Sequence, residues 1–280
     1  KSRFKFTDRA GDRLAFIAPR ATGPLRRSGP IAGAELDFLA EVASATPKIT
    51  LPSPSTMQFW HGPPAAAYSS SEDFFADLAA IYRAEIADLA ARGATLVQLD
   101  EVALAVLCDP AVRRAVEAAG QVPGQLVDDY VAAIAAAGAE RPAGVSLALH
   151  VCRGNYKGRW LASGGYEPVA EAVFAGAGAD VLFLEWDSFR AGGFEALRYV
   201  PATTSVVLGL VSSKTPQLEP RDHLVRRIEE ASRYVDIERL ALSPQCGFAS
   251  TAGGNPVSED DVRRKLELVV EVCDEVWGSP

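Results

Sequence analysis

Residues with metal-binding side chains follow directly after short apolar runs of the sequence. His150 and Cys152 end the run LALHVC, Glu185 follows VLFL, and Cys246 follows LALSPQ. Two thiolates, an imidazole and a carboxylate are a ligand set that zinc accepts in tetrahedral geometry. Zinc lowers the pKa of a bound thiol, and a carboxylate ligand that can leave makes room for the substrate sulfur. The sequence therefore predicts a zinc site that activates a thiol.

The spacing of the candidate ligands supports this interpretation. His150 and Cys152 are two residues apart, so their side chains leave the same face of an extended strand. A single buried cysteine more often packs in a core than binds metal, which is our interpretation of Cys108 and Cys273. Further polar side chains stand at the ends of predicted strands: Asp100, Glu101 and Lys214.

Strands and helices alternate regularly after residue 47. The predicted strands are 48–52, 95–99, 145–149, 181–184, 206–210 and 240–242, and the principal helices are 35–45, 71–93, 125–137, 169–174, 221–231 and 259–277. This alternation indicates parallel strands joined by right-handed crossovers, whose carboxyl ends share one edge. Six βα units are visible, whereas a closed (β/α)8 barrel has eight. Either the sheet is open, or two units are absent on the N-terminal side.

Residues 1–33 differ from the rest of the chain. Aromatic and aliphatic residues flank the turn-like sequence DRAGD, which predicts a β-hairpin or an extended arm inserted in a barrel. The arm favours the second alternative. We therefore expect residues 34–280 to form a catalytic TIM barrel that lacks its first two βα units. An N-terminal fragment or a homo-oligomer would then complete the barrel.

Composition excludes several classes of protein. The net charge of −8 argues against a nucleic-acid partner, which requires a basic surface. No apolar run reaches the roughly 18 residues of a membrane span. Four cysteines, widely spaced in 280 residues, indicate free thiols or metal ligands rather than a disulfide framework. We therefore expect a cytoplasmic protein that does not contact a membrane.

Several stretches resemble, in order, the C-terminal catalytic barrel of cobalamin-independent methionine synthase. They are PSPSTMQFW, VQLDEVAL, LHVCRGN, GADVLFLEWD, VVLGLVSSKT and LSPQCGFAS, and the resemblance covers residues 47–277. It is greater still to the shorter bacterial relatives that lack the N-terminal domain of that enzyme. The resemblance implies a TIM barrel of the methionine synthase/uroporphyrinogen decarboxylase-like type.

The resemblance also implies roles for individual residues. His150, Cys152 and Cys246 match zinc ligands, and Glu185 matches the glutamate that ligates zinc when homocysteine is absent. Asp100 matches the carboxylate that holds the substrate amino group, with Glu101 beside it as a further substrate contact. Trp60 matches a tryptophan of the methylfolate-binding loop. From its sequence context alone, Trp60 is either an exposed ring that stacks on a pterin or a packing residue at the barrel rim.

The sequence departs from this family pattern at one catalytic position. Methionine synthases carry a histidine, implicated in proton handling, after the strand that matches VVLGLV, whereas this chain has SSKT with Lys214 near that position. We predict a zinc-dependent methyltransferase that moves a methyl group from a folate-type or corrinoid donor to a thiol, homocysteine, to give methionine. Two alternatives stay open: another zinc-thiolate alkylation, such as epoxide opening by a thiol, and a non-catalytic zinc-binding barrel that acts as a partner module.

Overall fold

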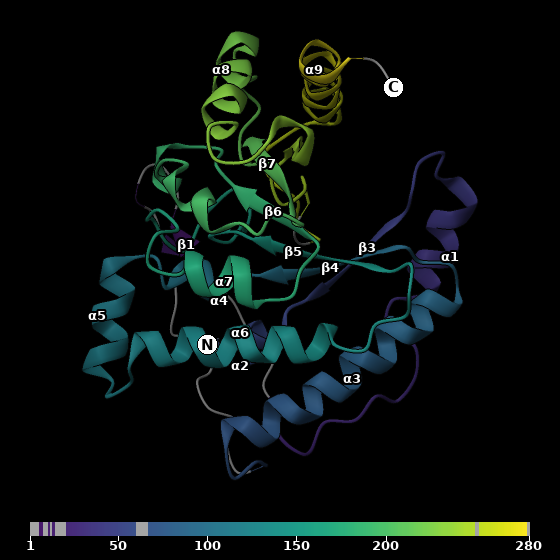
Figure 1. The fold of residues 1–280 in the computed structure, drawn as a ribbon, viewed down its shortest axis with the longest axis vertical. Coiled ribbons are helices and arrows are strands. Elements are labelled where there is room, and N and C mark those ends of the chain that lie inside the picture. The colour runs from purple at the N-terminus through teal and green to yellow at the C-terminus, as the bar shows by residue number, and fades with distance from the viewer. Residues whose placement is uncertain are drawn as a thin grey trace.

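Six parallel strands form the central sheet and follow one another in the order of the sequence (Figure 1). The computed structural model describes residues 6–7, 11, 13–14, 21–59, 67–249 and 252–278. The strands are β3 (Lys48–Pro52), β4 (Leu96–Glu101), β5 (Ser146–Val151), β6 (Val181–Glu185), β7 (Ser205–Val211) and β8 (Leu240–Pro244). All six predicted strands are confirmed. Their consecutive parallel order is that of a (β/α)8 barrel, and the described residues supply six of its eight strands.

The longer helices connect and cover these strands. They are α1 (Gly33–Val42), α3 (Ser71–Ala91), α6 (Pro123–Gly138), α7 (Ala170–Gly176), α8 (Arg221–Ala231) and α9 (Glu259–Trp277). Helix α3 lies along α6, and α9 packs beside α8 and β8 (Figure 1). Side-chain caps fix where two of them begin: Ser70 accepts a hydrogen bond from the Asp73 amide, and Ser258 forms a capping box with Asp261. These six helices confirm the six principal helices that the sequence predicts.

Shorter helices lie in the connections. They are α2 (Pro54–Phe59), α4 (Ala103–Val106), α5 (Pro110–Ala118), η1 (Phe189–Ala191), η2 (Glu195–Tyr199) and η3 (Ile237–Arg239). Residues 53–70 lie between the predicted strand 48–52 and the predicted helix 71–93, where no helix is predicted, and α2 forms in the first part of this connection. Pro54 suits a first helical turn because that position needs no N–H donor, and Phe59 is buried at the other end.

The core is apolar along the strands and becomes polar at their carboxyl ends. Fully buried aliphatic residues come from both the sheet and the helices: Leu89, Val97, Leu99, Ile134, Leu149, Leu182 and Leu208. At the strand ends, Glu101, His150 and Glu185 are also buried. Buried polar side chains are costly unless they are paired, so their concentration at one edge of the sheet marks a built site.

The N-terminal segment contacts the loop after β5. Strands β1 (Phe6–Thr7) and β2 (Arg13–Leu14) pair antiparallel. Thr7 exchanges backbone hydrogen bonds of 2.6 and 2.8 Å with Trp160. The described part of the predicted arm therefore lies against the loop that follows the candidate ligands, while the division at residue 33 stays a prediction.

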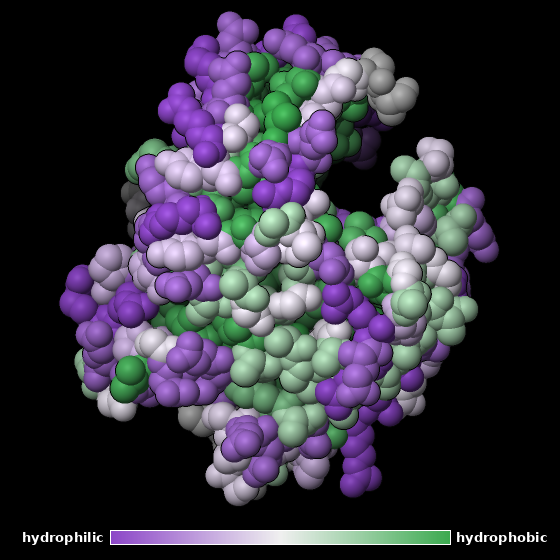
Figure 2. Space-filling model, in the orientation of Figure 1, coloured by the Kyte–Doolittle hydropathy of each residue, from purple (hydrophilic) through white to green (hydrophobic). Residues whose placement is uncertain are grey.

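An indentation separates the end of the molecule that carries α8 and α9 from the end that carries α1 (Figure 2). The outer strands of the sheet contact the helices of these two ends: β3 contacts α1, and β8 contacts α9. Apolar side chains are exposed on both: Phe38 and Val42 of α1 are each 62% exposed, and Val270 of α9 is 58% exposed. Among the described helices, none combines the length and the apolar character that crossing a membrane requires.

Candidate metal centre

Three of the four predicted zinc ligands lie together. The ligand atoms of His150, Cys152 and Cys246 are all within 4.8 Å of one another. His150 is in β5 and Cys152 directly follows it, whereas Cys246 is in the loop after β8. The alternation of a strand places the first two on one face, and the parallel sheet brings the end of β8 to the same edge.

The backbone at Cys246 is held in an unusual conformation. Its φ is 43°, in the left-handed region that non-glycine residues seldom adopt. The preceding residue, Gln245, anchors the turn through a backbone hydrogen bond of 2.8 Å to Val211 and donates its amide to the Cys246 sulfur at 3.3 Å. Such strain persists only where the surroundings impose it, which is common at functional sites.

The chemistry of the cluster fits a metal ion. His150 is buried, and its Nε2 has no hydrogen-bond partner among the residues that the structure describes. A hydrogen bond with Cys152 and the proximity of His150 outweigh burial and lower the pKa of the Cys246 thiol to about 5. The same hydrogen bond, together with burial, raises the pKa of the Cys152 thiol. An imidazole nitrogen without a hydrogen bond, together with two cysteine sulfurs, is a donor set suited to zinc.

Glu185, the fourth predicted ligand, lies beside this cluster but outside it. It follows Leu184, which pairs with Val151 of β5, so Glu185 is adjacent to Cys152 at the sheet edge. Its side chain is 1% exposed and is surrounded by cations. The Arg153 amide donates to it at 2.5 Å, and the Lys214 ammonium lies 3.1 Å away. Burial alone would raise the pKa of Glu185, but these charges hold it well below its usual range.

Lys214 joins Glu185 to a second buried carboxylate. Its ammonium nitrogen is 2.8 Å from Asp187, which also pairs with Arg190 at 3.2 Å. Burial alone would lower the pKa of Lys214, but Glu185 and Asp187 raise it well above its usual range. Lys214 is therefore a permanent cation at neutral pH and is unsuited to act as a general base.

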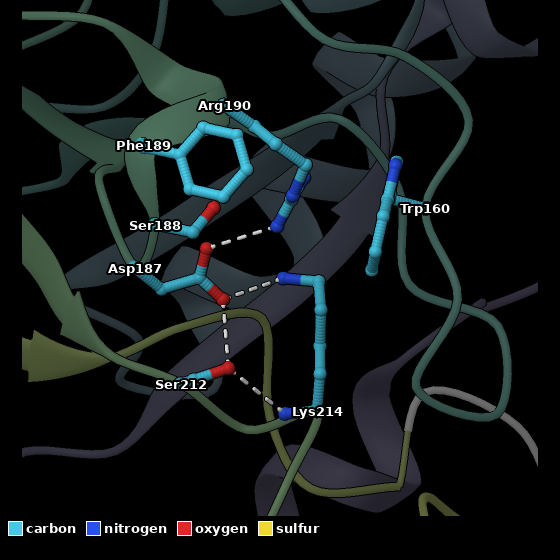
Figure 3. A pocket seen from close by; sticks show the side chains of 7 residues that line it. All are labelled: Trp160, Asp187, Ser188, Phe189, Arg190, Ser212 and Lys214. Atoms are coloured by element: carbon cyan, nitrogen blue, oxygen red, sulfur yellow. Dashed lines mark hydrogen bonds and ion pairs between the residues drawn. The ribbon is translucent and has the colours of Figure 1, made fainter. Parts of the chain in front are cut away.

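A cavity of about 440 Å³ opens beside this ion-pair network (Figure 3). Its lining consists of Trp160, Asp187, Ser188, Phe189, Arg190, Ser212 and Lys214. The Arg190 guanidinium lies over the Trp160 ring, 4.2 Å from its centroid. Phe189 is 96% exposed, which is exceptional for a large apolar side chain. The cavity thus offers charged groups on its inner wall and an uncovered aromatic ring.

Asp100 stands next to the cluster on the neighbouring strand. It pairs with His150 in the register of β4 and β5. Its carboxylate accepts a hydrogen bond of 2.6 Å from Gln98, whose own amide oxygen accepts one of 2.8 Å from Lys48. This chain of contacts orients Asp100, which is half-buried and thus open to a ligand.

The remaining predicted substrate contacts are placed differently. Glu101 is fully buried and accepts hydrogen bonds from the hydroxyls of Ser53 and Ser55 and from the Leu104 amide. These contacts tie the carboxylate to the start of α2, and its contact with substrate stays a prediction. Trp60 lies outside the described residues.

Several residues of the site have no clear signal in the sequence. Arg190 lies in the short helix η1 and Trp160 in the connection after β5, and no periodic pattern predicts that they stack. Asp187 and Arg190 are three residues apart after a buried strand, which is the one signal that could have indicated an ion pair there. Gln98 lies within an apolar strand, two residues before Asp100. Residues two apart leave the same face of a strand, and this spacing is the signal that could have indicated their contact.

Comparisons with known proteins identify the family of this chain. The family model described as "Cobalamin-independent synthase, Catalytic domain" matches residues 34–275. The chain is 43% identical to the uncharacterized protein YxjG of Bacillus subtilis, over 87% of this chain and 65% of YxjG. It is 28% identical to a methionine synthase of Pyrococcus abyssi, over 72% of this chain and 50% of that protein. This chain therefore spans between half and two thirds of the length of these relatives.

Solved structures show the same fold. A Listeria monocytogenes protein, described as a proposed vitamin-B12 independent methionine synthase, superposes with a TM-score of 0.70 at 29% identity. The superposition covers 92% of this chain and 73% of the Listeria chain. The family match, the consecutive parallel strands and the cluster at their carboxyl ends lead to one assignment. The chain belongs to the cobalamin-independent methionine synthase family, whose catalytic domain it matches over residues 34–275.

Proposed function

We propose that this chain is the catalytic barrel of a zinc-dependent methyltransferase that methylates a thiol, homocysteine, to give methionine. The observation that carries the proposal is the cluster of His150, Cys152 and Cys246, in which His150 is buried and its Nε2 has no hydrogen-bond partner among the described residues. When bound, zinc would supply the acidity that converts the thiol to a thiolate at neutral pH. The relatives named methionine synthase support the same reaction class.

The surrounding residues have separate roles in the proposal. Asp100, beside His150, would hold the amino group of homocysteine through a charge-assisted hydrogen bond. A folate-type or corrinoid donor would approach over the carboxyl edge of the sheet, with Trp60 as a stacking residue. Methyl transfer by direct displacement needs the sulfur and the methyl carbon in line, so positioning should supply much of the rate.

Lys214 is not a proton carrier in this proposal. It stays charged between Glu185 and Asp187, so it acts electrostatically where methionine synthases carry a histidine. The proton of the thiol therefore leaves to solvent.

The proposal extends to a partner and a location. The outer strands β3 and β8 and the exposed apolar residues Phe38, Val42 and Val270 suit a further segment or a second copy that completes the barrel. Widely spaced cysteines, with a free thiol pair in the cluster, suit the cytoplasm.

An acceptor and donor screen tests the proposed reaction. The zinc-loaded protein is incubated with homocysteine and, in turn, with methyltetrahydrofolate, methylcobalamin or a small alkyl donor, and methionine is measured by mass spectrometry. We expect methionine with one donor, and none with Cys246→Ser. If an epoxide is the only donor that alkylates the thiol, epoxide opening by a thiol replaces methyl transfer as the proposed reaction. Zinc binding without product from any donor would favour the partner module.

A further inference from the structure

The carboxylate of Glu185 is saturated with donors in this structure. Its Oε1 lies 3.1 Å from Lys214 Nζ and 3.4 Å from Arg190 Nη2. Its Oε2 lies 2.5 Å from the Arg153 amide and 3.4 Å from Arg153 Nη1. A carboxylate has about four lone-pair sites. Glu185 can therefore reach a metal held by its neighbours only by giving up one of these contacts.

The three cations around Glu185 are not equally replaceable. Arg153 is fixed within the fold, because its guanidinium lies over Tyr166 at 4.3 Å and donates to the Gly164 carbonyl. Arg190 lies in η1, just after the strand that ends at Glu185, and rests on Trp160. Lys214 comes from a different strand end, after β7, and its ammonium ties the Glu185 carboxylate to that part of the site.

Asp187 fixes Lys214 in this position. The Asp187 carboxylate accepts from the Lys214 ammonium at 2.8 Å and from the Ser212 hydroxyl at 2.9 Å (Figure 3). The side chains of Lys214 and Asp187 are 3% and 1% exposed, so solvent screens their interaction little. Lys214 is thus oriented toward Glu185 by a partner that is itself held in place.

We propose that Lys214 is a positioning residue that competes with the metal for Glu185 and so keeps a coordination position available to the acceptor thiol. The inference rests on the proposed zinc-thiol function. It assigns a role to the lysine that stands where the family pattern has a histidine. The thiol that binds the metal then displaces, at most, a Glu185 carboxylate that is weakly bound to it. The thiol proton is released to solvent.

Replacement of Lys214 tests the competition. Lys214→Met frees Glu185 Oε1 for the metal, so we expect zinc to bind more tightly and homocysteine to bind more weakly, each by about tenfold. Zinc affinity is measured by competition with a chromophoric chelator, and homocysteine affinity by calorimetry on the zinc-loaded protein. Lys214→Gln keeps a hydrogen-bond donor but removes the charge, so it should also strengthen zinc binding and weaken homocysteine binding. This variant takes the place of Lys214→Met if that protein does not fold.

A double-mutant cycle separates this role from a merely structural one. In the Glu185→Gln background, Lys214→Met should leave zinc affinity unchanged, because the group through which it acts is gone. Arg27→Met is the matched control. Arg27 pairs at 2.8 Å with Glu85, another fully buried glutamate, which belongs to α3 and to no part of the cluster. We expect this control to leave both affinities unchanged.

The outcomes are distinct. Unchanged zinc and thiol affinities in Lys214→Met, or an effect that persists in the Glu185→Gln background, would overturn the competition while the proposed function stands. A wild-type protein that binds no zinc would overturn both. X-ray absorption at the zinc edge gives an independent readout: without thiol, the oxygen ligand from Glu185 should be more occupied in Lys214→Met than in the wild type.

Discussion

Asp100 and His150 are paired residues on neighbouring parallel strands, β4 and β5. This register sets a candidate substrate carboxylate beside a candidate metal ligand. The two side chains stand at the same level of the sheet because the strands end together at its carboxyl edge. The site therefore depends on strand register as well as on residue identity.

Asp100→Asn should weaken the binding of homocysteine selectively. The substitution removes the charge that would meet the substrate ammonium, and a hydrogen bond to a charged group contributes about 1.5–3 kcal/mol, or roughly 10–100-fold in affinity. The measurement is the Kd of homocysteine compared with that of 4-mercaptobutanoate, which lacks the amino group. Equal weakening of both thiols would show that Asp100 does not contact the amine.

Cys246 should be the most reactive cysteine of the zinc-free protein. The hydrogen bond with Cys152 lowers its pKa to about 5, whereas burial raises the pKa of Cys108 to about 12. Iodoacetamide should therefore label Cys246 first at pH 7, with a rate that is half-maximal near pH 5 and falls below it. Peptide mapping by mass spectrometry checks the site, and Cys246→Ser is the control. A labelling rate that rises only near pH 9 would contradict the assignment of the thiolate.

Glu185→Gln should destabilise the protein at pH 7 and progressively less in acid. The folded-state pKa of Glu185 lies below its unfolded value, because neighbouring cations outweigh burial. The stabilisation is therefore complete above the unfolded pKa of about 4.3 and is lost as the pH falls through and below it. Breaking a buried pair costs about 3–5 kcal/mol.

Urea unfolding of wild type and variant at several pH values measures this difference. Glu167→Gln is the control, since Glu167 and Arg198 form a pair in which each side chain is 46% exposed. Exposed pairs contribute about 0–1 kcal/mol, so this control should change little at any pH. A deficit of Glu185→Gln that does not shrink as the pH falls below about 4, the unfolded pKa, would argue against an ionised Glu185.

Gly209→Ala should perturb the metal ligands through Gln245. A Cβ at position 209 of β7 would stand 2.9 Å from the Leu184 carbonyl and collide with the Gln245 side chain. Gln245 donates to Cys246, so its displacement should weaken zinc binding, and the overpacking should cost about 1–3 kcal/mol of stability. Chelator competition measures the zinc affinity, and urea unfolding measures the free energy of unfolding.

Gly124→Ala is the matched control for that variant. Nothing lies within 4 Å of a Cβ at Gly124, near the start of α6, so alanine should be tolerated there without loss of zinc affinity. If Gly209→Ala loses stability but keeps full zinc affinity, Gln245 is not needed to position Cys246.

The sequence was sufficient to predict the strands and the proximity of three candidate metal ligands. Apolar runs of strand length, spaced by helical patterns, define a parallel sheet, and such a sheet gathers its strand ends at one edge. His150, Cys152 and Cys246 could therefore be grouped although they lie on different units. The short helix α2 was missed because a helix of six residues between Pro and Phe has too few turns to show a period.

The surroundings of Glu185 could not be predicted in the same way. Its partner Lys214 lies in the loop after β7 and its partner Arg190 in the short helix η1. The paths of these connections depend on tertiary packing rather than on local pattern. The sequence shows a glutamate at a strand end but not whether it faces a metal or a lysine. The cavity beside Trp160 depends on the same loops.

Zinc coordination with and without homocysteine tests the central claim most directly. X-ray absorption at the zinc edge should show two sulfur ligands and at least one nitrogen in the protein alone, and a third sulfur after homocysteine is added. Cys246→Ser should lose stoichiometric zinc, whereas Cys273→Ser, which alters a cysteine outside the cluster, should keep it. Stoichiometric zinc retained in Cys246→Ser, or a sulfur count that homocysteine does not change, would contradict a thiol-activating metal centre at this site.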